Sequence, residues 1–335
     1  MTDSWFKSLF GFTENTGYDK NPSLEVHNYV TKNVSEDNII SLHSKLTNRT
    51  FQVGKFSILS LDDLRKKTRC YIKTSTKSRA LVHHIHVRDI FDEHYKNPGS
   101  LFQVASQFNV LEMRSPKNIP ELGITDYAID DTQGPACSLA CSAATLYRNY
   151  FITVRDIDNN IHIGQSQHNQ INNLDDVQKV LNNEFFWMKN GYVFSNKNDL
   201  TKLNKIFHNY EEDICKTLKF AIHFNTEVCF IDRFTPAPDI RYVSQIFCSS
   251  LSCNYSGIDS LFWEPFARII LKASYEATLL AAIYNRNNGG TNKVFLTLLG
   301  GGAFGNKIDW IMDAIQYAID SIREYHSDLQ ILICR

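Results

Sequence analysis

A glycine-rich segment near the C-terminal end of the sequence has the composition of a phosphate-binding loop. It follows the apolar run 294–299, which reads as a buried strand, and a helix is predicted to begin at Asp309. Glycines let backbone N–H groups approach a ligand, and a helix start offers unpaired N–H groups to an anion. Neither the standard dinucleotide pattern nor the standard ATP pattern is present, and the alternative is a tight strand–helix turn. The predicted phosphate-binding residues are Gly300, Gly301, Gly302, Ala303, Phe304, Gly305 and Asn306.

Two adjacent carboxylates precede a second predicted helix start. Asp130 and Asp131 lie just upstream of Gln133, Gly134 and Pro135, and proline is favoured in the first turn of a helix. Carboxylates close to each other and to a bound phosphate can have a raised pKa, which suits a general acid or base. The alternative is that Asp131 only caps the helix.

Amide and hydroxyl side chains end a predicted strand in the middle of the sequence. Gln103, Ser106 and Asn109 could bind ribose hydroxyls or a base edge, and the alternative is a polar strand end without a ligand. Glu112 follows directly, and Glu112 and Asp126 are the next candidates for a catalytic carboxylate after Asp130 and Asp131.

Metal, membrane and nucleic-acid functions have little support. His83, His84 and His86 lack partners at metal-ligand spacing, and none of the eight cysteines forms a C-x-x-C pair, so no metal site is predicted. No apolar run approaches the roughly 18 residues that a membrane span needs. The net charge of -1 disfavours nucleic acid as a partner, although the basic stretch 65–79 keeps that alternative open. A cytoplasmic location is expected, because no signal peptide is recognisable.

The elements that must position these residues alternate between strand and helix. Apolar runs at 218–224, 243–249, 294–299 and 329–334 read as strands, and long amphipathic helices are predicted at 263–285 and 309–325. Such alternation requires crossover connections and a largely parallel sheet covered on both faces. We therefore predict an α/β fold with three layers, α/β/α, around a mixed sheet. Residues 1–80 are expected to form an N-terminal extension packed on a core domain of residues 81–335.

These phrases, in this order, resemble a macrodomain, a fold that binds ADP-ribose. The phrase 87–90, Val-Arg-Asp-Ile, resembles the segment whose aspartate binds adenine, which implies this role for Asp89. The resemblance also implies that Asn109 meets the distal ribose, that the glycine-rich segment binds the diphosphate, and that Phe304 borders the distal ribose. The fold it implies is macrodomain-like.

Several phrases are similar to a divergent macrodomain-like group that includes bacterial effector hydrolases. These enzymes remove ADP-ribose from arginine on modified ubiquitin. The phrases are 102–109, 132–137, 147–151, 190–192 and 297–306. The resemblance implies hydrolysis of ADP-ribose from a modified protein side chain, with aspartates in catalysis, no required cofactor, and ADP-ribose as ligand or product. The partner it implies is an ADP-ribosylated protein, with ubiquitin as one candidate. A reader module that binds ADP-ribose without cleaving it is the alternative.

Overall fold

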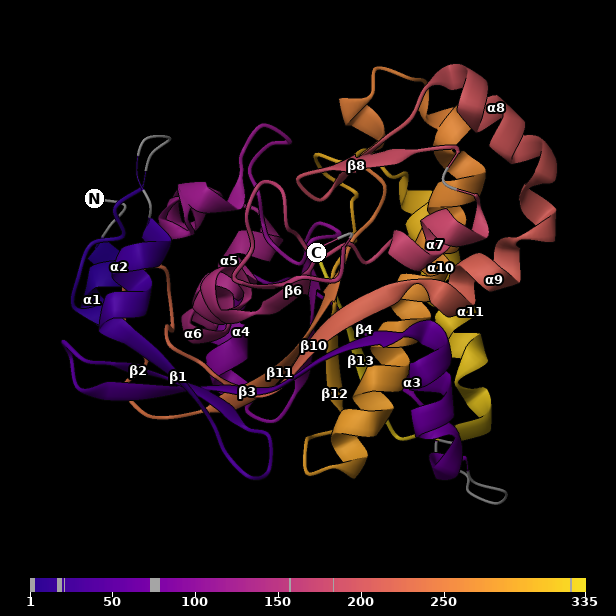
Figure 1. The fold of residues 1–335 in the computed structure, drawn as a ribbon. Coiled ribbons are helices and arrows are strands. Elements are labelled where there is room, and N and C mark those ends of the chain that lie inside the picture. The colour runs from indigo at the N-terminus through magenta and orange to yellow at the C-terminus, as the bar shows by residue number, and fades with distance from the viewer. Residues whose placement is uncertain are drawn as a thin grey trace.

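A nine-stranded mixed sheet forms the centre of the protein (Figure 1). The computed structural model describes residues 4–16, 20, 22–72, 79–156, 158–182, 184–325 and 327–335. In spatial order the strands are β1 (Val30–Val34), β2 (Ile40–Ser44), β3 (Arg49–Ser60), β10 (Lys219–Glu227), β11 (Tyr242–Cys248), β5 (Leu101–Ala105), β12 (Lys293–Leu296), β13 (Gln330–Cys334) and β4 (Leu81–Ile85). Two small hairpins are formed by β6 (Thr153–Arg155) with β7 (Ile161–Ile163) and by β8 (Trp187–Lys189) with β9 (Tyr192–Phe194).

The sheet has a parallel half and an antiparallel half. From β11 through β5, β12 and β13 to β4, each strand pairs in parallel with its neighbour. From β1 through β2, β3 and β10 to β11, each pairing is antiparallel. Parallel neighbours end at the same edge of a sheet, so β5, β11 and β12 deliver the residues that follow them to one place.

Helices cover both faces of the sheet (Figure 1). One face carries α3 (Leu61–Thr68), α7 (Asp175–Val180), α8 (Lys197–Ile206), α9 (Glu211–Thr217), α10 (Ser260–Asn287) and α11 (Ile308–Ser321). The other carries α1 (Ser4–Phe10), α2 (Pro22–Tyr29), α4 (Ile90–Lys96), α5 (Gln133–Ala140) and α6 (Ser142–Leu146).

The protein has two main hydrophobic cores, one on each face of the sheet, because side chains along the central strands point alternately to the two faces. In β5, Leu101 packs into the α10 side of the molecule, whereas Phe102 and Val104 pack into the α4–α6 side. Successive side chains of a strand point to opposite faces, so a strand that is apolar at each position is buried between two helical layers. The predicted three-layer α/β/α arrangement with a mixed sheet is confirmed. None of the described helices is both long enough and apolar enough to span a membrane.

The helix that starts at Gln133 is short, and the helical geometry of the chain changes twice after it. α5 ends at Ala140, and Cys141 leaves helical geometry with φ −116° and ψ 57°. α6 follows, and Tyr147–Phe151 then winds as a π-helix. The break turns the chain so that Arg148, on the π-helix, lies completely buried behind α5.

The N-terminal region enters the same sheet as the rest of the chain. Trp5, Phe6, Phe10 and Phe12 are buried, as their apolar character requires. β3 pairs with β10 from Lys55 to Ser60, so the sheet continues across residue 80. The division into an extension and a core at that residue remains a prediction.

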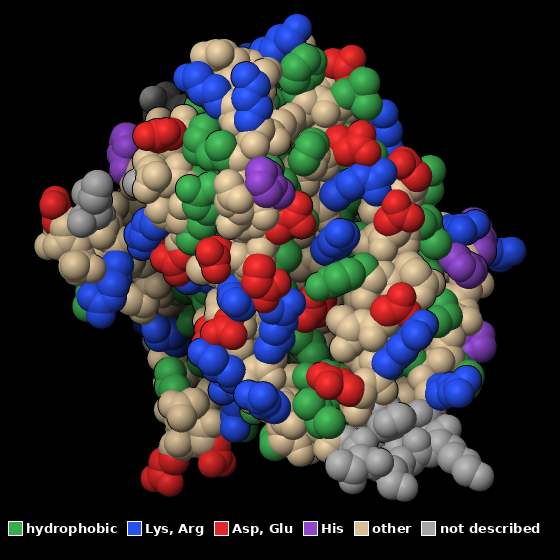
Figure 2. Space-filling model, turned by 90° about the vertical axis from the view of Figure 1, so that its right-hand side faces the viewer, with side chains coloured by type: hydrophobic (Ala, Val, Ile, Leu, Met, Phe, Trp, Pro, Cys, Tyr) green, Lys and Arg blue, Asp and Glu red, His purple; other side chains and the backbone are tan. Residues whose placement is uncertain are grey.

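Part of the basic stretch 65–79 is engaged in ion pairs. Arg65 contacts Glu276 at 2.6 Å and Glu212 at 2.8 Å, and Lys66 contacts Asp62 at 2.6 Å. Residues 73–78 lie outside the described residues. Figure 2 shows this side of the molecule, where Lys and Arg side chains alternate with Asp and Glu. This face therefore presents mixed charge, which does not favour the nucleic-acid alternative.

Candidate functional site

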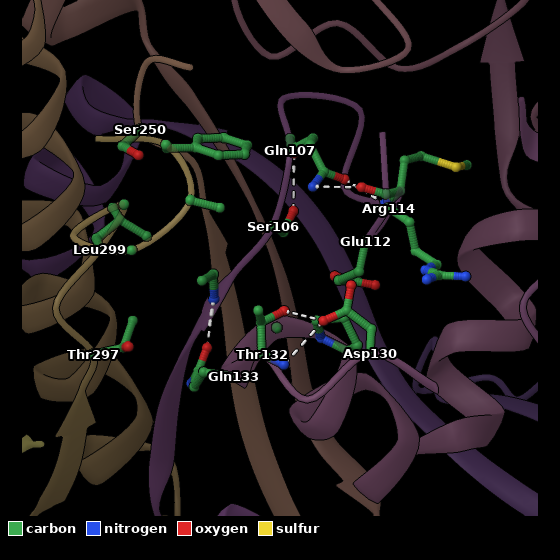
Figure 3. Close-up of a pocket in the computed structure, with 18 of the residues that line it drawn as sticks. Ser106, Gln107, Glu112, Arg114, Asp130, Thr132, Gln133, Ser250, Thr297 and Leu299 are labelled. Atoms are coloured by element: carbon green, nitrogen blue, oxygen red, sulfur yellow. Dashed lines mark hydrogen bonds between the residues drawn. The ribbon is translucent and has the colours of Figure 1, made fainter. Parts of the chain in front are cut away.

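A cavity of about 380 Å³ opens beyond the carboxyl ends of β5, β11 and β12 (Figure 3). This is the edge at which open α/β sheets bind ligands. The ends of the three strands and the segments that follow them all contribute to it: 105–107 at the end of β5, Ser250 after β11, and 297–300 with 302–304 after β12. The remaining walls come from 112–114, Asp130, 132–135, Tyr192 and Tyr255.

The glycine-rich segment forms one wall of the cavity with unpaired backbone donors. Gly300, Gly302, Ala303 and Phe304 all line it. Among the described residues, the N–H groups of these four residues donate to no acceptor, whereas Gly301 N–H donates to Leu298 O and Gly305 N–H to Gly302 O. Gly300 has φ +72°, and a Cβ on it would lie 1.9 Å from Ser250 Oγ. A cluster of free N–H groups on a tight loop is suited to bind phosphate oxygens.

The N-terminus of α5 faces the same cavity from another side. Gln133, Gly134 and Pro135 line it, and the Thr132 side chain does not cap the helix. Gly134 permits close packing, because a Cβ there would lie 1.8 Å from the backbone oxygen of Ala105 on β5. Gln133 fastens the two elements together, since its Oε1 accepts from Ala105 N–H at 2.9 Å and its Nε2 donates to Gln103 O at 2.8 Å. The positive end of the α5 dipole thus lies beside the glycine-rich segment.

The two adjacent aspartates take different positions. Asp130 lines the cavity, and its Oδ1 accepts from Thr132 N–H at 2.9 Å and from Thr132 Oγ1 at 2.6 Å. The Asp131 side chain is 95% exposed and pairs with Arg233 at 3.0 Å. Neither aspartate caps α5. Of the two, Asp130 can act on a ligand in this cavity.

Glu112 is a buried acidic residue in the wall of the cavity. It lines the cavity, yet it is only 1% exposed, and its Oε1 has no hydrogen-bond partner among the described residues. Burial raises the pKa of Glu112 to about 7, although the nearby Arg148 charge opposes the rise. In Figure 3 the carboxyl groups of Glu112 and Asp130 lie on the same side of the cavity. A carboxyl group that exchanges its proton near neutral pH can serve as general acid or general base.

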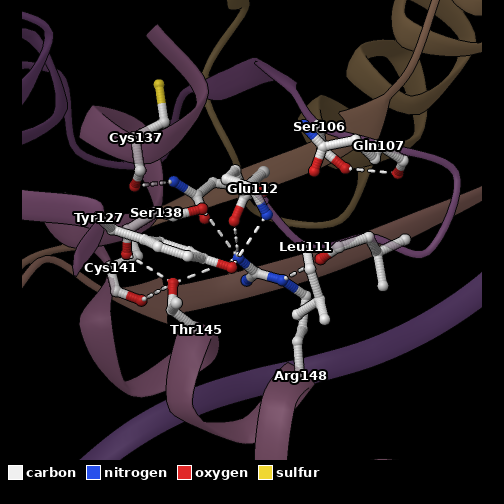
Figure 4. A network of polar contacts seen from close by, with 12 residues as sticks. Ser106, Gln107, Leu111, Glu112, Tyr127, Cys137, Ser138, Cys141, Thr145 and Arg148 are labelled. Carbon is white, nitrogen blue, oxygen red and sulfur yellow. Dashed lines mark hydrogen bonds and ion pairs between the residues drawn. The ribbon is translucent and has the colours of Figure 1, made fainter. Parts of the chain in front are cut away.

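Arg148 supports Glu112 from behind (Figure 4). Its Nη2 lies 3.4 Å from Glu112 Oε2 and also donates to Ser138 Oγ at 2.9 Å. Its Nε donates to Val110 O at 2.9 Å, and its guanidinium lies over the Phe247 ring at 3.9 Å. Both partners of the ion pair are buried, and burial of the Glu112 charge has a desolvation cost. A contact as long as 3.4 Å offsets this cost only in part.

Three aromatic rings form a further wall. Tyr192, Tyr255 and Phe304 pack against one another with ring centroids 5.0 to 5.6 Å apart, and all three line the cavity. Tyr192 Oη donates to Met113 O at 2.5 Å, which ties this wall to the segment that carries Glu112. Such a wall can contact the apolar face of a sugar or a base.

A second cavity of about 420 Å³ adjoins the first. Gln133 and Thr297 line both cavities, and Asp89, Arg88 and Arg233 line the second. Asp89 caps α4, where its Oδ1 accepts from Phe91 N–H at 2.9 Å. The two cavities together form one extended hollow on both sides of Gln133.

The structure brings nine of the predicted site residues to the first cavity. They are Ser106, Glu112, Asp130, Gln133, Gly134, Gly300, Gly302, Ala303 and Phe304.

Other predicted residues hold the protein together near the site and do not line the first cavity. Gln103 Nε2 donates to Thr278 Oγ1, and Asn109 Nδ2 donates to Gln170 Oε1. Asn306 is buried and donates to Leu251 O at 2.8 Å. The reason is that a buried amide needs hydrogen-bond partners, and here protein groups supply them, although Asn306 Oδ1 has no partner among the described residues. Gly301 and Gly305 are also outside the lining, and Asp126 lines a separate, much smaller hollow.

Sequence reasoning missed several residues of the site. Arg148 and Tyr192 lie within the phrases 147–151 and 190–192 that carry the resemblance, but neither was among the predicted site residues, and Tyr255 lies in none of these phrases. Gln107, Arg114, Thr132 and Thr297 also line the cavity, next to residues that were predicted. Across the described residues, no group of three or more His, Cys, Asp or Glu side chains is arranged to hold a metal ion.

No protein-family model matches the chain, and no curated protein matches it either. Among solved structures it is similar to a poly(ADP-ribose) glycohydrolase from Thermomonospora curvata, with a TM-score of 0.46, 8% identity, and coverage of 93% of this chain and 89% of that one. The corresponding enzyme from Deinococcus radiodurans in complex with ADP-ribose gives a TM-score of 0.43, 9% identity, and coverage of 83% and 86%. These values describe how far the chain paths superpose, whereas the chemistry of the site comes from its own residues.

Proposed function

We propose that the two adjoining cavities bind ADP-ribose and that the protein hydrolyses the bond between ADP-ribose and a modified protein side chain. The observation that carries the catalytic part is Glu112: a buried carboxyl group with an unpaired oxygen and a pKa of about 7, in the wall of a cavity whose other walls offer phosphate donors. A site that only binds ADP-ribose has no need of such a group. The sequence resemblance to macrodomain-like hydrolases supports the same assignment.

Unpaired N–H groups support a position for the diphosphate. Gly300, Gly302, Ala303 and Phe304, whose N–H groups donate to no acceptor among the described residues, line the same cavity as the N-terminus of α5, which suits a doubly charged diphosphate. The distal ribose then extends toward Glu112 and Asp130. The adenosine lies on the other side of Gln133, in the second cavity, where Asp89 is available for the adenine amino group.

Hydrolysis requires a proton donor and an activated water. Water adds to the anomeric carbon of the distal ribose, the bond to the side-chain heteroatom breaks, and the proton released from water leaves through a carboxylate. Glu112 can give a proton to the departing group in its neutral form and take one from water in its ionised form, since its pKa is near neutrality. Asp130, which is part of the same wall, can hold a ribose hydroxyl or orient the water. The glycine-rich segment fixes the diphosphate and so limits the motion of the ribose.

Two measurements test this proposal. ADP-ribose is titrated calorimetrically and its effect on the melting temperature is recorded, because a ligand that binds the folded state raises that temperature. Release of ADP-ribose is then followed from proteins modified through different linkages, including arginine-linked ADP-ribosylated ubiquitin. Glu112→Gln is compared with Asp126→Asn, a matched acid-to-amide change outside the first cavity.

The expected result is binding, release by the wild type, retained release by Asp126→Asn, and a loss of about 10²-fold or more in Glu112→Gln. Binding without release from any linkage would replace the hydrolase with the reader. Absence of ADP-ribose binding would overturn the proposal.

A further inference from the structure

The N-terminal segment, residues 4–16, is bonded directly to a loop of the candidate site. This loop, residues 123–132, contains Tyr127 and Asp130 and leads into α5. Two residues of the N-terminal segment form hydrogen bonds with Thr125 of this loop, at its carbonyl oxygen, its N–H group and its hydroxyl group. Trp5 Nε1 donates to Thr125 O at 3.0 Å, while Thr125 N–H donates to Glu14 Oε2 at 2.7 Å and Thr125 Oγ1 donates to the same oxygen.

Both oxygens of the Glu14 carboxylate accept hydrogen bonds, most of them from this loop. Glu14 is 2% exposed. Ile124 N–H donates to it at 2.9 Å, and Tyr150 Oη donates to its Oε1. Gly123, with φ +78°, leaves the space for it: a Cβ at Gly123 would lie 2.6 Å from the Glu14 carboxyl carbon. A carboxylate with this many donors determines the path of the backbone that it binds.

The loop passes this constraint to the candidate catalytic groups. Tyr127 Oη accepts from Glu112 N–H at 2.9 Å, so the position of Tyr127 determines where Glu112 lies. Arg233 holds the other end of the loop through Ala128 O and through Asp130 O at 3.2 Å. The loop is therefore fixed at both ends, and Glu112 and Asp130 both depend on it.

We propose that Glu14, assisted by Trp5, is a positioning residue of the candidate active site: the N-terminal segment supplies the carboxylate that fixes loop 123–132 against Glu112. This inference rests on the proposed function for its catalytic consequence, but the positioning itself is measurable without turnover. Glu14→Gln keeps the shape of the side chain and replaces an acceptor by an NH₂ group, which cannot accept from the loop amides.

The test compares Glu14→Gln with Ser44→Ala. Ser44 is buried and donates to Phe10 O at 2.8 Å, so this control loses a buried hydrogen bond to the same segment without touching the loop. We expect Glu14→Gln to lower kcat roughly 10-fold or more and to change KM less than about threefold, because displacement of a reacting group acts on the chemical step. Hydrogen exchange of the Ile124, Thr125 and Glu112 amides should become faster by about 10-fold or more. Ser44→Ala should keep both the kcat and the exchange rates of the wild type.

The outcomes separate positioning from function. A folded Glu14→Gln protein with wild-type kcat would overturn the inference, even if its loop amides exchanged faster. If the wild type releases no ADP-ribose, the proposed function has failed. Hydrogen exchange then tests the positioning role by itself, because unchanged protection of the Glu112 amide in Glu14→Gln would overturn it. If Glu14→Gln does not fold, Trp5→Phe takes its place in the test and is judged by the same criteria. This change keeps an aromatic side chain and removes the N–H donor.

Discussion

The unusual environment of Glu112 predicts a specific dependence of stability on pH. In the unfolded chain the pKa of a glutamate has its ordinary value of 4.5, whereas burial raises it to about 7 in the folded protein. Below pH 4.5 Glu112 is protonated in both states and causes no loss of stability. As the pH rises from 4.5 to 7 the unfolded state ionises first, so stability is lost across this window. The difference between the two values, at 1.36 kcal/mol per pKa unit, corresponds to about 3 kcal/mol.

Glu112→Gln removes this titration and leaves the shape of the side chain. It also leaves the Arg148 charge without its partner, which is a cost that does not vary across this pH range. Glu14 is another buried carboxyl group whose pKa burial raises, but it is present in both proteins and cancels in their difference. The free energy of unfolding of the wild type minus that of Glu112→Gln should therefore fall by about 3 kcal/mol between pH 4.5 and pH 8.

Urea unfolding curves recorded at half-unit intervals of pH measure this difference, and equal slopes in the two proteins confirm that the same transition is compared. The refuting result is a constant difference between the two proteins across the whole range. It would mean that Glu112 is hydrated or fully compensated by Arg148, and the reason for assigning it as an acid–base group would be lost.

Three further predictions concern the loops and the N-terminal segment. Asp130→Asn should keep the melting temperature and lower ADP-ribose release roughly 10²-fold, whereas Asp131→Asn should release it at the wild-type rate because Asp131 does not line the first cavity. Release by both variants at the wild-type rate would remove Asp130 from the mechanism. Gly302→Glu should abolish the rise in melting temperature that ADP-ribose causes, while Gly302→Ala should retain it, since a Cβ there meets no atom within 4 Å. An undiminished rise in Gly302→Glu would show that the diphosphate does not bind at this segment. Limited proteolysis should not rapidly release an intact core that lacks residues 1–75, because β1 to β3 belong to the central sheet; early appearance of such a core would contradict this.

Local pattern was sufficient for several central strands, for the two long helices and for loops that line the cavity. The apolar run at 294–299 overlaps β12 and the run at 329–334 contains β13, and the amphipathic spacing at 263–285 and 309–325 marks α10 and α11. The glycine-rich segment and Gln133-Gly134-Pro135 were found for the same reason: glycine before a helix and proline in its first turn have effects that depend only on neighbouring residues. Parallel strands end at one edge, so their convergence could also be predicted.

Only the tertiary structure decided which polar residues face the cavity and which acid is perturbed. Gln103, Asn109 and Asn306 have the residue types of a binding site, yet the side-chain NH₂ group of each donates to a protein group from a distant element. Glu112 and Asp130 are both acidic residues near predicted site residues, but Glu112 is buried beside Arg148 and its N–H group donates to Tyr127 Oη, whereas the Asp130 carboxylate accepts from the neighbouring Thr132. The place of Glu14 depends on a contact with residues more than 100 positions away. Burial and desolvation are properties of the assembled fold, so no local pattern encodes them.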